Sequence, residues 1–288
     1  NPKSGLPHAA EADVVLGITP KWFFEAAPKL RWVHATASGV DMFMYPEFVN
    51  ADVVLTGEKG LVGGHLADHA FGLLLGLTRR IAMAQTLGSD GWTQENRERM
   101  RFSELELEGL TMGIIGFGGT GRHIARRAVA FGMEVQAMDV YPVEPSDGVD
   151  VVHGPDKLDH IIATSDVLAV GLPLTDQTRG MCNDEFFAKM KDTAIMLNVT
   201  RGEIIDGPSL ERALAHGTIG GAALDVAPVE PLPADSPLWN LDNCVMTPHT
   251  AGASQRRGRR NIERFCRNLI AAREGRPVEG VVDKQAGF

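Results

Sequence analysis

Apolar residues along the first part of the chain form short β-rich runs separated by segments with helical spacing. The strand-like runs lie at 13–17, 32–36 and 53–56, and short helices are expected between them at 20–28 and 42–48. The stretch 66–85 is long, apolar and free of proline, which predicts one long helix. Strands that alternate with helices favour a parallel sheet covered by helices.

From residue 110 onward the alternation becomes regular. Six further strand-like runs lie at 111–116, 134–139, 167–172, 194–199, 221–226 and 244–247. Helical patterns between them lie at 120–131, 158–163, 184–191 and 208–216. Six strands with intervening helices are enough for one doubly wound parallel sheet. The amphipathic tail at 254–273 is expected to return to the first part, so the second domain is inserted into a smaller one.

Composition narrows the class of protein. Lys plus Arg is 28 and Asp plus Glu is 37, so the net charge is 28 − 37 = −9, which argues against binding to a nucleic-acid backbone. No apolar run approaches the roughly 18 residues of a membrane span. The three cysteines, Cys182, Cys244 and Cys266, show no CxxC spacing, so neither a disulfide framework nor a metal cluster is expected, and a reducing, cytoplasmic location fits. Because residues 1–4 lack both Met and a signal pattern, we expect a truncated N-terminus.

A glycine loop follows the first strand of the regular region. Gly116, Gly118 and Gly121 match G-x-G-x-x-G, a weak signal alone in a chain with 32 glycines. Here a compact apolar strand precedes it, a helical pattern follows it, and the next strand ends in Asp139. Such a loop lets a pyrophosphate approach the backbone at a helix N-terminus, and the acidic residue accepts hydrogen bonds from the ribose. The loop therefore predicts a Rossmann domain that binds NAD, with NADP disfavoured by the charge of Asp139.

Three chemically useful side chains follow later strands of the same sheet. Ligands of such sheets bind beyond the carboxyl ends of the strands, and Arg201, Glu230 and His249 all fall near these ends. Reduction of a 2-keto acid needs a proton donor, which suits His249, and a cation for the substrate carboxylate, which suits Arg201. Glu230 can orient the imidazole and stabilise its protonated form. Singly each residue is more often structural, but together they predict a catalytic site.

These segments resemble the NAD-dependent D-isomer-specific 2-hydroxyacid dehydrogenases over nearly the whole chain. The resemblance is carried by residues 113–118, 198–206, 221–226, 230–233 and 247–249, and 281–283 is similar to the family's C-terminal end. It implies a doubly wound (Rossmann) nucleotide domain inserted into a smaller flavodoxin-like α/β substrate domain. The expected ranges are 1–80 for the first part of the substrate domain, 81–252 for the NAD-binding domain and 253–288 for the returning helix.

The resemblance also implies roles for individual residues. Arg201, Glu230 and His249 match the family's substrate-binding arginine, supporting glutamate and acid/base histidine. The expected cofactor site comprises Gly116, Gly118, Gly119, Thr120, Gly121, Asp139, Leu172, Pro173, Thr200, Asp225, His249 and Gly252. Besides Arg201, the expected substrate contacts are Ser38, Gly39 and Val40, in a loop whose N–H groups bind the substrate carboxylate. No metal is expected, and a homodimer through the helix at 66–85 is implied.

Several positions depart from the family pattern. Gly119-Thr120 stands where Arg-Ile is common, so one charged contact to the pyrophosphate is absent, and Ala227-Pro228 replaces a common aromatic residue. The expected activity is hydride transfer between NAD(H) and a small 2-keto or D-2-hydroxy acid, with glyoxylate or hydroxypyruvate suggested by analogy. The alternative is an NAD-sensing corepressor or binding protein of the same fold, since such proteins can keep the same residues. Trp92, in a polar loop, is expected to pack rather than to cover a substrate.

Overall fold

The computed structural model describes residues 2–287 and divides the chain into two compact units. The first unit holds the residues up to Val62, Pro173–Thr175 and the chain from Ala253 onward. The second unit holds Gly63–Leu172 and Asp176–Gly252. One α/β unit is thus inserted into a smaller one, as the sequence predicts. The division after Val62 lies earlier than the expected boundary after residue 80, because the helix from Gly63 packs on the larger sheet.

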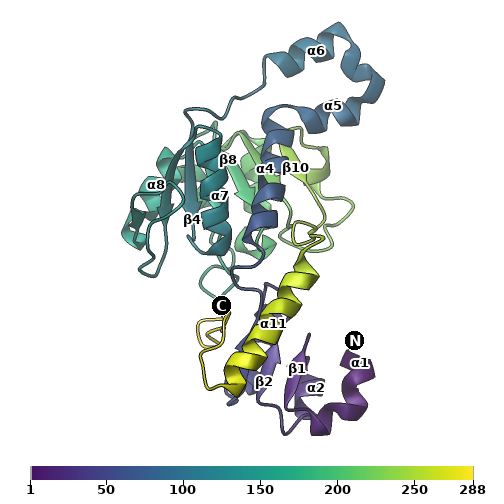
Figure 1. Cartoon of the computed structure of the whole chain (residues 1–288). Coiled ribbons are helices and arrows are strands. Elements are labelled where there is room, and N and C mark those ends of the chain that lie inside the picture. The colour runs from purple at the N-terminus through teal and green to yellow at the C-terminus, as the bar shows by residue number, and fades with distance from the viewer. Residues whose placement is uncertain (1, 288) are drawn as a thin grey trace. The chain divides into compact units, whose positions relative to one another are not determined.

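The first unit contains a three-stranded parallel sheet of order β1-β2-β3 (Figure 1). These strands are Val14–Leu16, Trp32–His34 and Val54–Thr56, each shorter than the apolar run that predicts it. Short helices lie at Pro2–Gly5 (α1), Leu6–Glu11 (η1), Lys21–Glu25 (α2), Asp41–Phe43 (η2) and Pro46–Val49 (α3). Phe43, Phe48 and Val33 form the centre of its apolar core. The returning helix α11, Arg257–Arg273, belongs to this unit.

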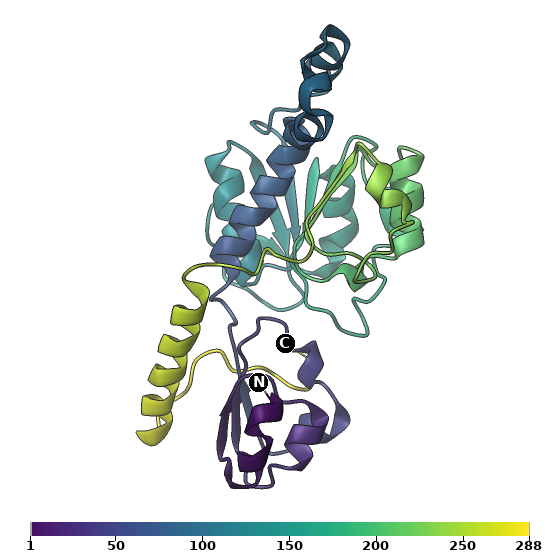
Figure 2. The ribbon, with the colours of Figure 1, turned by 90° about the vertical axis from the view of Figure 1, so that its right-hand side faces the viewer.

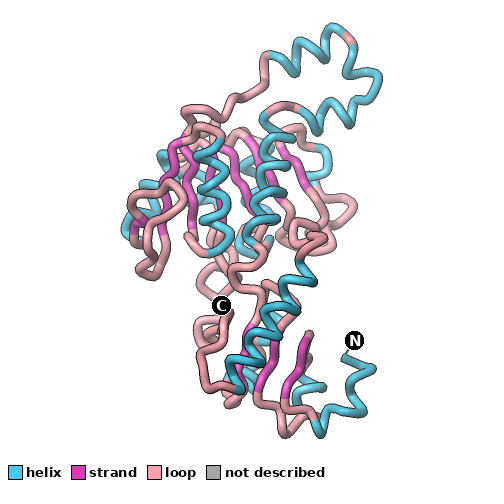
Figure 3. Tube along the Cα trace, viewed as in Figure 1, coloured by secondary structure: helices cyan, strands magenta, loops and turns pink. Residues whose placement is uncertain are grey.

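The second unit contains a parallel sheet whose strands are magenta in Figure 3. It has seven strands in the order β10-β9-β8-β7-β4-β5-β6. The strands are Thr111–Ile115 (β4), Glu134–Met138 (β5), Val152–His153 (β6), Val167–Val170 (β7), Ile195–Asn198 (β8), Gly221–Leu224 (β9) and Cys244–Met246 (β10). Their order reverses between β4 and β7, the crossover of a doubly wound nucleotide-binding sheet. The two-residue β6 was not predicted, because it has too few residues for a detectable periodicity.

Helices flank this sheet on both faces (Figure 2). They are Gly63–Thr78 (α4), Gly119–Ala130 (α7), Leu158–Thr164 (α8), Asp184–Lys189 (α9) and Gly207–Ala215 (α10). Single 3-10 turns lie at Pro155–Lys157 (η4), Gly202–Ile204 (η5) and Pro237–Asn240 (η6). Helices α4 and α7 lie side by side, and the rings of Phe71 and Phe131 stack between them at 5.1 Å. In the described range 2–287, no helix has the length and apolarity needed to cross a bilayer.

The prediction of one helix over 66–85 is wrong. Helix α4 ends at Thr78, and Arg80 has a left-handed backbone with φ of 53°. The chain then forms α5 (Ile81–Leu87), η3 (Gly88–Trp92) and α6 (Gln94–Arg101), which project from the sheet (Figure 1). Within this arm, defined as residues 81–102, only Gly91 is buried, and Trp92 is 82% exposed instead of packed. A propensity pattern detects the helical residues but not the turn of the chain between them.

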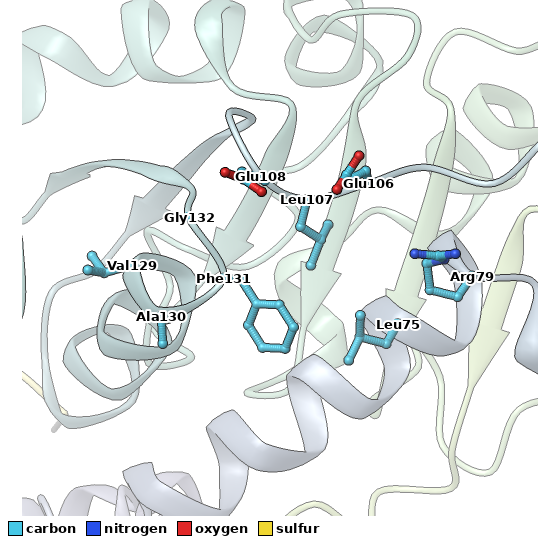
Figure 4. A pocket seen from close by; sticks show the side chains of 9 residues that line it. All are labelled: Leu75, Arg79, Glu106, Leu107, Glu108, Val129, Ala130, Phe131 and Gly132. Atoms are coloured by element: carbon cyan, nitrogen blue, oxygen red, sulfur yellow. The ribbon is translucent and has the colours of Figure 1, made fainter.

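A pocket of about 540 Å³ opens at the amino ends of the strands (Figure 4). Leu107 and Glu108 approach β4 on one side of it, and Phe131 and Gly132 lead from α7 into β5 on the other. Leu75 of α4 and Arg79, directly after this helix, complete the lining together with Glu106, Val129 and Ala130. Since ligands of such sheets bind at the opposite, carboxyl edge, this pocket is not part of the predicted cofactor site.

Candidate active site

The glycine loop has the backbone geometry that close approach of a phosphate requires. Gly116 has φ of 93°, and a Cβ there would lie 2.8 Å from the carbonyl carbon of Gly171. A Cβ at Gly121 would overlap the carbonyl oxygen of Gly116, so this glycine allows α7 to pack on β4. Gly118 instead faces open space and precedes α7 with no side-chain cap. The N-terminus of α7 is therefore accessible to an anion at Gly118, Gly119 and Thr120.

Asp139 follows β5 and is held beside this loop. Its Oδ2 accepts the N–H of Phe117 at 2.8 Å, and its Oδ1 accepts the N–H of Tyr141 at 3.1 Å. Each carboxylate oxygen can accept a further hydrogen bond. The guanidinium of Arg122 lies 4.9 Å from the centroid of the Phe117 ring and donates to the carbonyl of Glu144. The carboxylate is thus fixed at the carboxyl edge of the sheet.

His249 and Glu230 form the predicted pair. Nδ1 of His249 lies 2.8 Å from Oε2 of Glu230, and the N–H of Ala227 donates to Oε1 of Glu230 at 3.0 Å. An ionised carboxylate only accepts hydrogen bonds, so Nδ1 carries the proton in this pair. Both side chains are about two-fifths exposed, at 44% for His249 and 39% for Glu230. The ring is therefore oriented at one nitrogen and has Nε2 available for proton exchange.

Asp225 holds the segment that carries His249. Its fully buried carboxylate accepts the N–H groups of Thr250 at 2.9 Å and Ala251 at 2.7 Å, and the hydroxyl of Thr247 at 2.6 Å. The N–H of His249 donates to the main-chain oxygen of Asp225 at 2.7 Å. His249 itself has a left-handed φ of 55°, a conformation that a non-glycine residue keeps only when its surroundings hold it. Asp225 supplies those surroundings.

Arg201 lies in the loop after β8, next to the same structure. Asn198 organises this loop: its amide donates to the carbonyl of Arg201 at 2.9 Å, and its oxygen accepts the N–H of Thr200 at 2.9 Å. A Cβ at Gly202 would overlap the carbonyl of Ala227, so the Arg201 loop lies against the residue that anchors Glu230. The sequence-predicted trio thus comes from adjoining loops at one edge of the sheet, with a direct contact between Glu230 and His249.

The remaining predicted site residues are distributed over both units. Leu172, Thr200 and Gly252 belong to the second unit and are half-buried, whereas Pro173 groups with the first. The expected substrate loop lies in the first unit, where Ser38 is exposed and the side chain of Val40 is part of the apolar core. The side chain of Val40 is therefore not available to contact a ligand. The groups of this loop that can do so are its backbone N–H groups and the residues Ser38 and Gly39.

Sequence reasoning missed two residues that support the site. The sequence indicates Asn198 only as part of the segment 198–206 and His69 only as part of the apolar helical pattern at 66–85. His69 lies on α4 with Nε2 2.7 Å from the hydroxyl of Thr247 and 3.3 Å from Oδ1 of Asp225. A histidine within the apolar pattern of 66–85 was the available signal, but its partners lie 156 and 178 positions along the chain (225 − 69 and 247 − 69), so no local pattern indicates them.

The chain is similar to dehydrogenases of one family. Residues 71–251 match the family model described as D-isomer specific 2-hydroxyacid dehydrogenase, NAD binding domain. A glyoxylate reductase of Korarchaeum cryptofilum is 36% identical over 265 residues, which cover 91% of this chain and 79% of that protein. A D-isomer specific 2-hydroxyacid dehydrogenase family protein from Aeromonas salmonicida has a crystal structure with a TM-score of 0.82 and 31% identity, covering 99% of this chain and 89% of the other.

A second solved structure is similar to the same extent. The NADPH-dependent glyoxylate/hydroxypyruvate reductase of Sinorhizobium meliloti, in complex with NADP and sulfate, has a TM-score of 0.82 and 27% identity, and the match covers 98% of this chain and 90% of that one. The doubly wound sheet agrees with these matches. The chain therefore belongs to the D-isomer specific 2-hydroxyacid dehydrogenase family of oxidoreductases.

Proposed function

We propose that this protein reduces a small 2-keto acid to the D-2-hydroxy acid with NADH, and catalyses the reverse oxidation. The observation that carries the proposal is the Glu230–His249 pair, 2.8 Å apart, at the carboxyl edge of a sheet that also carries a glycine loop. Because Glu230 occupies Nδ1, His249 can exchange a proton at Nε2.

The residues present fit a dinucleotide. Gly118 leaves open space where a Cβ would stand, and α7 begins directly after it without a side-chain cap. Asp139 stands at the end of the neighbouring strand with accepting capacity for ribose hydroxyls. Gly119, Thr120, Gly121, Thr200, Asp225, Gly252 and the Leu172-Pro173 turn are proposed to complete the cofactor site. When bound, the cofactor supplies the hydride.

Residues of this chain supply the proton transfer, orient the acid/base group and bind the substrate carboxylate. His249 donates a proton from Nε2 to the ketone oxygen, and in the reverse direction it accepts the proton from the hydroxyl. Glu230 orients the ring and stabilises its protonated form. Arg201 binds the substrate carboxylate with two parallel hydrogen bonds. The loop of Ser38, Gly39 and Val40 is proposed to contribute backbone N–H groups to the same carboxylate.

We propose NAD rather than NADP as the cofactor, on the charge of Asp139. A 2′-phosphate beside this carboxylate would meet like charge, which costs affinity. The relative from S. meliloti is NADPH-dependent, so the fold accepts NADP(H), and we propose that the residue at position 139 decides the choice in this chain. Asp139→Ala is expected to lower the ratio of NADH to NADPH use in steady-state assays by about tenfold or more. An unchanged ratio would remove Asp139 from this role.

Glyoxylate and hydroxypyruvate are the proposed substrates. The support is that relatives of about one-third identity are glyoxylate reductases, and another is a hydroxypyruvate reductase. Both compounds present a carboxylate next to a ketone or aldehyde carbon, which suits the proposed roles of Arg201 and His249. Specificity between them depends on side chains around the substrate's third carbon.

We also propose a homodimer that uses α4 and the arm. The arm exposes Trp92 at 82% and Phe102 at 88%, and Gly91 is its only buried residue among those described. Helices this short are marginal in water without packing, so a covering surface stabilises them. A second copy offers such a surface, which places the dimer contact next to the end of α4.

The test is a steady-state assay of NADH and NADPH oxidation with a panel of 2-keto acids. Turnover with glyoxylate or hydroxypyruvate, lost by at least about 10³-fold in His249→Ala while NADH binding changes little, is the expected result. No turnover of the wild-type protein with any 2-keto acid, together with tight NADH binding, would favour the corepressor alternative. Turnover retained within about tenfold of wild type in His249→Ala would contradict the acid/base role.

A further inference from the structure

We infer that His69 is a positioning residue for the acid/base histidine, acting through Thr247 and Asp225. The inference rests on the proposed function for His249. His69 lies on α4, outside the loops that carry the site, and is joined to them by two polar contacts. Its side chain is 27% exposed, and that of Asp225 is fully buried.

The direction of the hydrogen bonds follows from the acceptors. Both oxygens of Asp225 accept backbone N–H groups, from Thr250 and Ala251, as an ionised carboxylate does. The hydroxyl of Thr247 therefore donates its one proton to Oδ1 of Asp225, over 2.6 Å. With that proton committed, the Thr247 oxygen can only accept from His69, so Nε2 of His69 carries a hydrogen. The chain of donation runs from His69 to Thr247 to Asp225.

The end of this chain is the backbone of His249. Thr247 and Thr250 bind the same oxygen of Asp225, and His249 lies between them with its left-handed φ of 55°. Its N–H is bound by the carbonyl of Asp225 at 2.7 Å. Rotation of the Thr247 hydroxyl away from Asp225 would release one of the bonds that close this turn. The N–H of His69 opposes that rotation, because it donates to the hydroxyl oxygen of Thr247 from the side of α4 and so leaves the hydroxyl proton directed at Asp225.

Nε2 of His69 also lies 3.3 Å from Oδ1 of the buried Asp225. A fully buried carboxylate is costly unless it is paired or hydrogen-bonded on several sides. The N–H of His69 therefore adds a favourable electrostatic contact to the three hydrogen bonds that the Asp225 carboxylate accepts. A side chain that fills the same space without an N–H removes this contribution but leaves α4 packed.

Three variants test the inference by kinetics. In His69→Leu, kcat for 2-keto acid reduction is expected to fall about tenfold while KM for NADH stays within about twofold, because the pyrophosphate end is untouched. In His69→Gln, whose amide can donate to Thr247, kcat is expected to stay within about threefold of wild type. The matched control is His160→Leu, an exposed histidine on α8, which leaves kcat unchanged. Equal losses in the Leu and Gln variants would indicate bulk packing and overturn the inference.

A double-mutant cycle with Thr247→Val tests the route. If His69 acts through Thr247, His69→Leu costs no further kcat in the Thr247→Val background. Losses that multiply independently in the double variant would overturn the inference.

A measurement without substrate separates this inference from the proposed function. ¹⁵N-edited NMR of the imidazoles is expected to show the neutral ring of His69 with its proton on Nε2. A proton on Nδ1 alone would overturn the inference. Absent turnover with every 2-keto acid would reject the proposed function while this tautomer stays measurable.

Discussion

At the scale of single residues, the glycines around the loop before α7 have different surroundings, and this predicts different consequences of the same substitution. A methyl group at Gly118 meets no atom within 4 Å, and φ there is an ordinary −77°. A methyl group at Gly121 overlaps the carbonyl oxygen of Gly116. Gly118 therefore leaves open space in which a ligand can lie, whereas Gly121 allows α7 to pack closely on β4.

Gly118→Ala is accordingly expected to fold with thermal stability close to wild type but to raise KM for NADH by about tenfold or more, since the methyl group occupies the space proposed for the pyrophosphate. Gly121→Ala is the matched control and is expected to lower the melting temperature, with a cost of about 1–3 kcal/mol for overpacking. Thermal unfolding and NADH titration of both variants check this. Unchanged NADH affinity in a folded Gly118→Ala protein would contradict the proposed cofactor site.

The sequence predicts the residues of the candidate site but not the contacts that hold their loops in place. The glycine spacing, Asp139 and the trio of Arg201, Glu230 and His249 follow from order along the chain, because strand ends of a parallel sheet meet at one edge. The contact of Gly202 with Ala227 and the bonds from Thr247 to Asp225 could not be predicted. They depend on how closely loops far apart in sequence approach each other, where a few tenths of an ångström decide whether a contact forms.

At the scale of elements, the small sheet of the first unit contains a buried histidine. His34 on β2 is fully buried, its Nδ1 lies 2.7 Å from the hydroxyl of Thr56 on β3, and its Nε2 has no hydrogen-bond partner in the described structure. Burial, followed by the nearby Arg264, lowers the pKa of His34 from its usual value of 6.5, and Glu58 opposes this shift. The folded unit therefore favours the neutral ring.

This predicts acid lability of the first unit. A base whose pKa is lowered by folding leaves stability intact above the unfolded value of about 6.5 and reduces it as pH falls below that value, because the unfolded chain then binds the proton more readily. His34→Asn, which can still bond to Thr56, is expected to flatten the decline of melting temperature between pH 7 and pH 5. His160→Asn, at an exposed site, should leave that decline unchanged. Parallel pH profiles for wild type and His34→Asn would contradict the assignment.

At the scale of the whole molecule, the arm of residues 81–102 packs little against the rest of the described chain. Its helices bury almost nothing, and its two large aromatic side chains face solvent. Exposed aromatic residues on a projecting element are characteristic of protein interfaces. The proposed occupant of that surface is a second copy of the chain, which makes the oligomeric state the decisive measurement.

Trp92→Ser combined with Phe102→Ser is expected to shift the protein from a dimer to a monomer of 31.1 kDa at low micromolar concentration. The reason is that truncating large interface aromatics commonly costs about 2 kcal/mol or more each. Light scattering coupled to gel filtration measures this. Trp22→Ser, an exposed tryptophan of the first unit, is the control and should leave the mass unchanged. A double variant with the wild-type mass would exclude the arm from the contact.

The sequence by itself determined the alternation of strands and helices, the inserted α/β domain, the glycine loop and the order in which acidic, basic and imidazole groups follow the strands. These features depend on the spacing of apolar, glycine and ionisable residues along the chain, which can be counted directly in the sequence. The tertiary structure decided where α4 ends, that Trp92 is exposed, and that His69, Thr247 and Asp225 join to hold the turn at His249. Such features arise because hydrogen bonds and van der Waals contacts depend on short distances in space, which residues remote in sequence acquire only when the sheet has assembled.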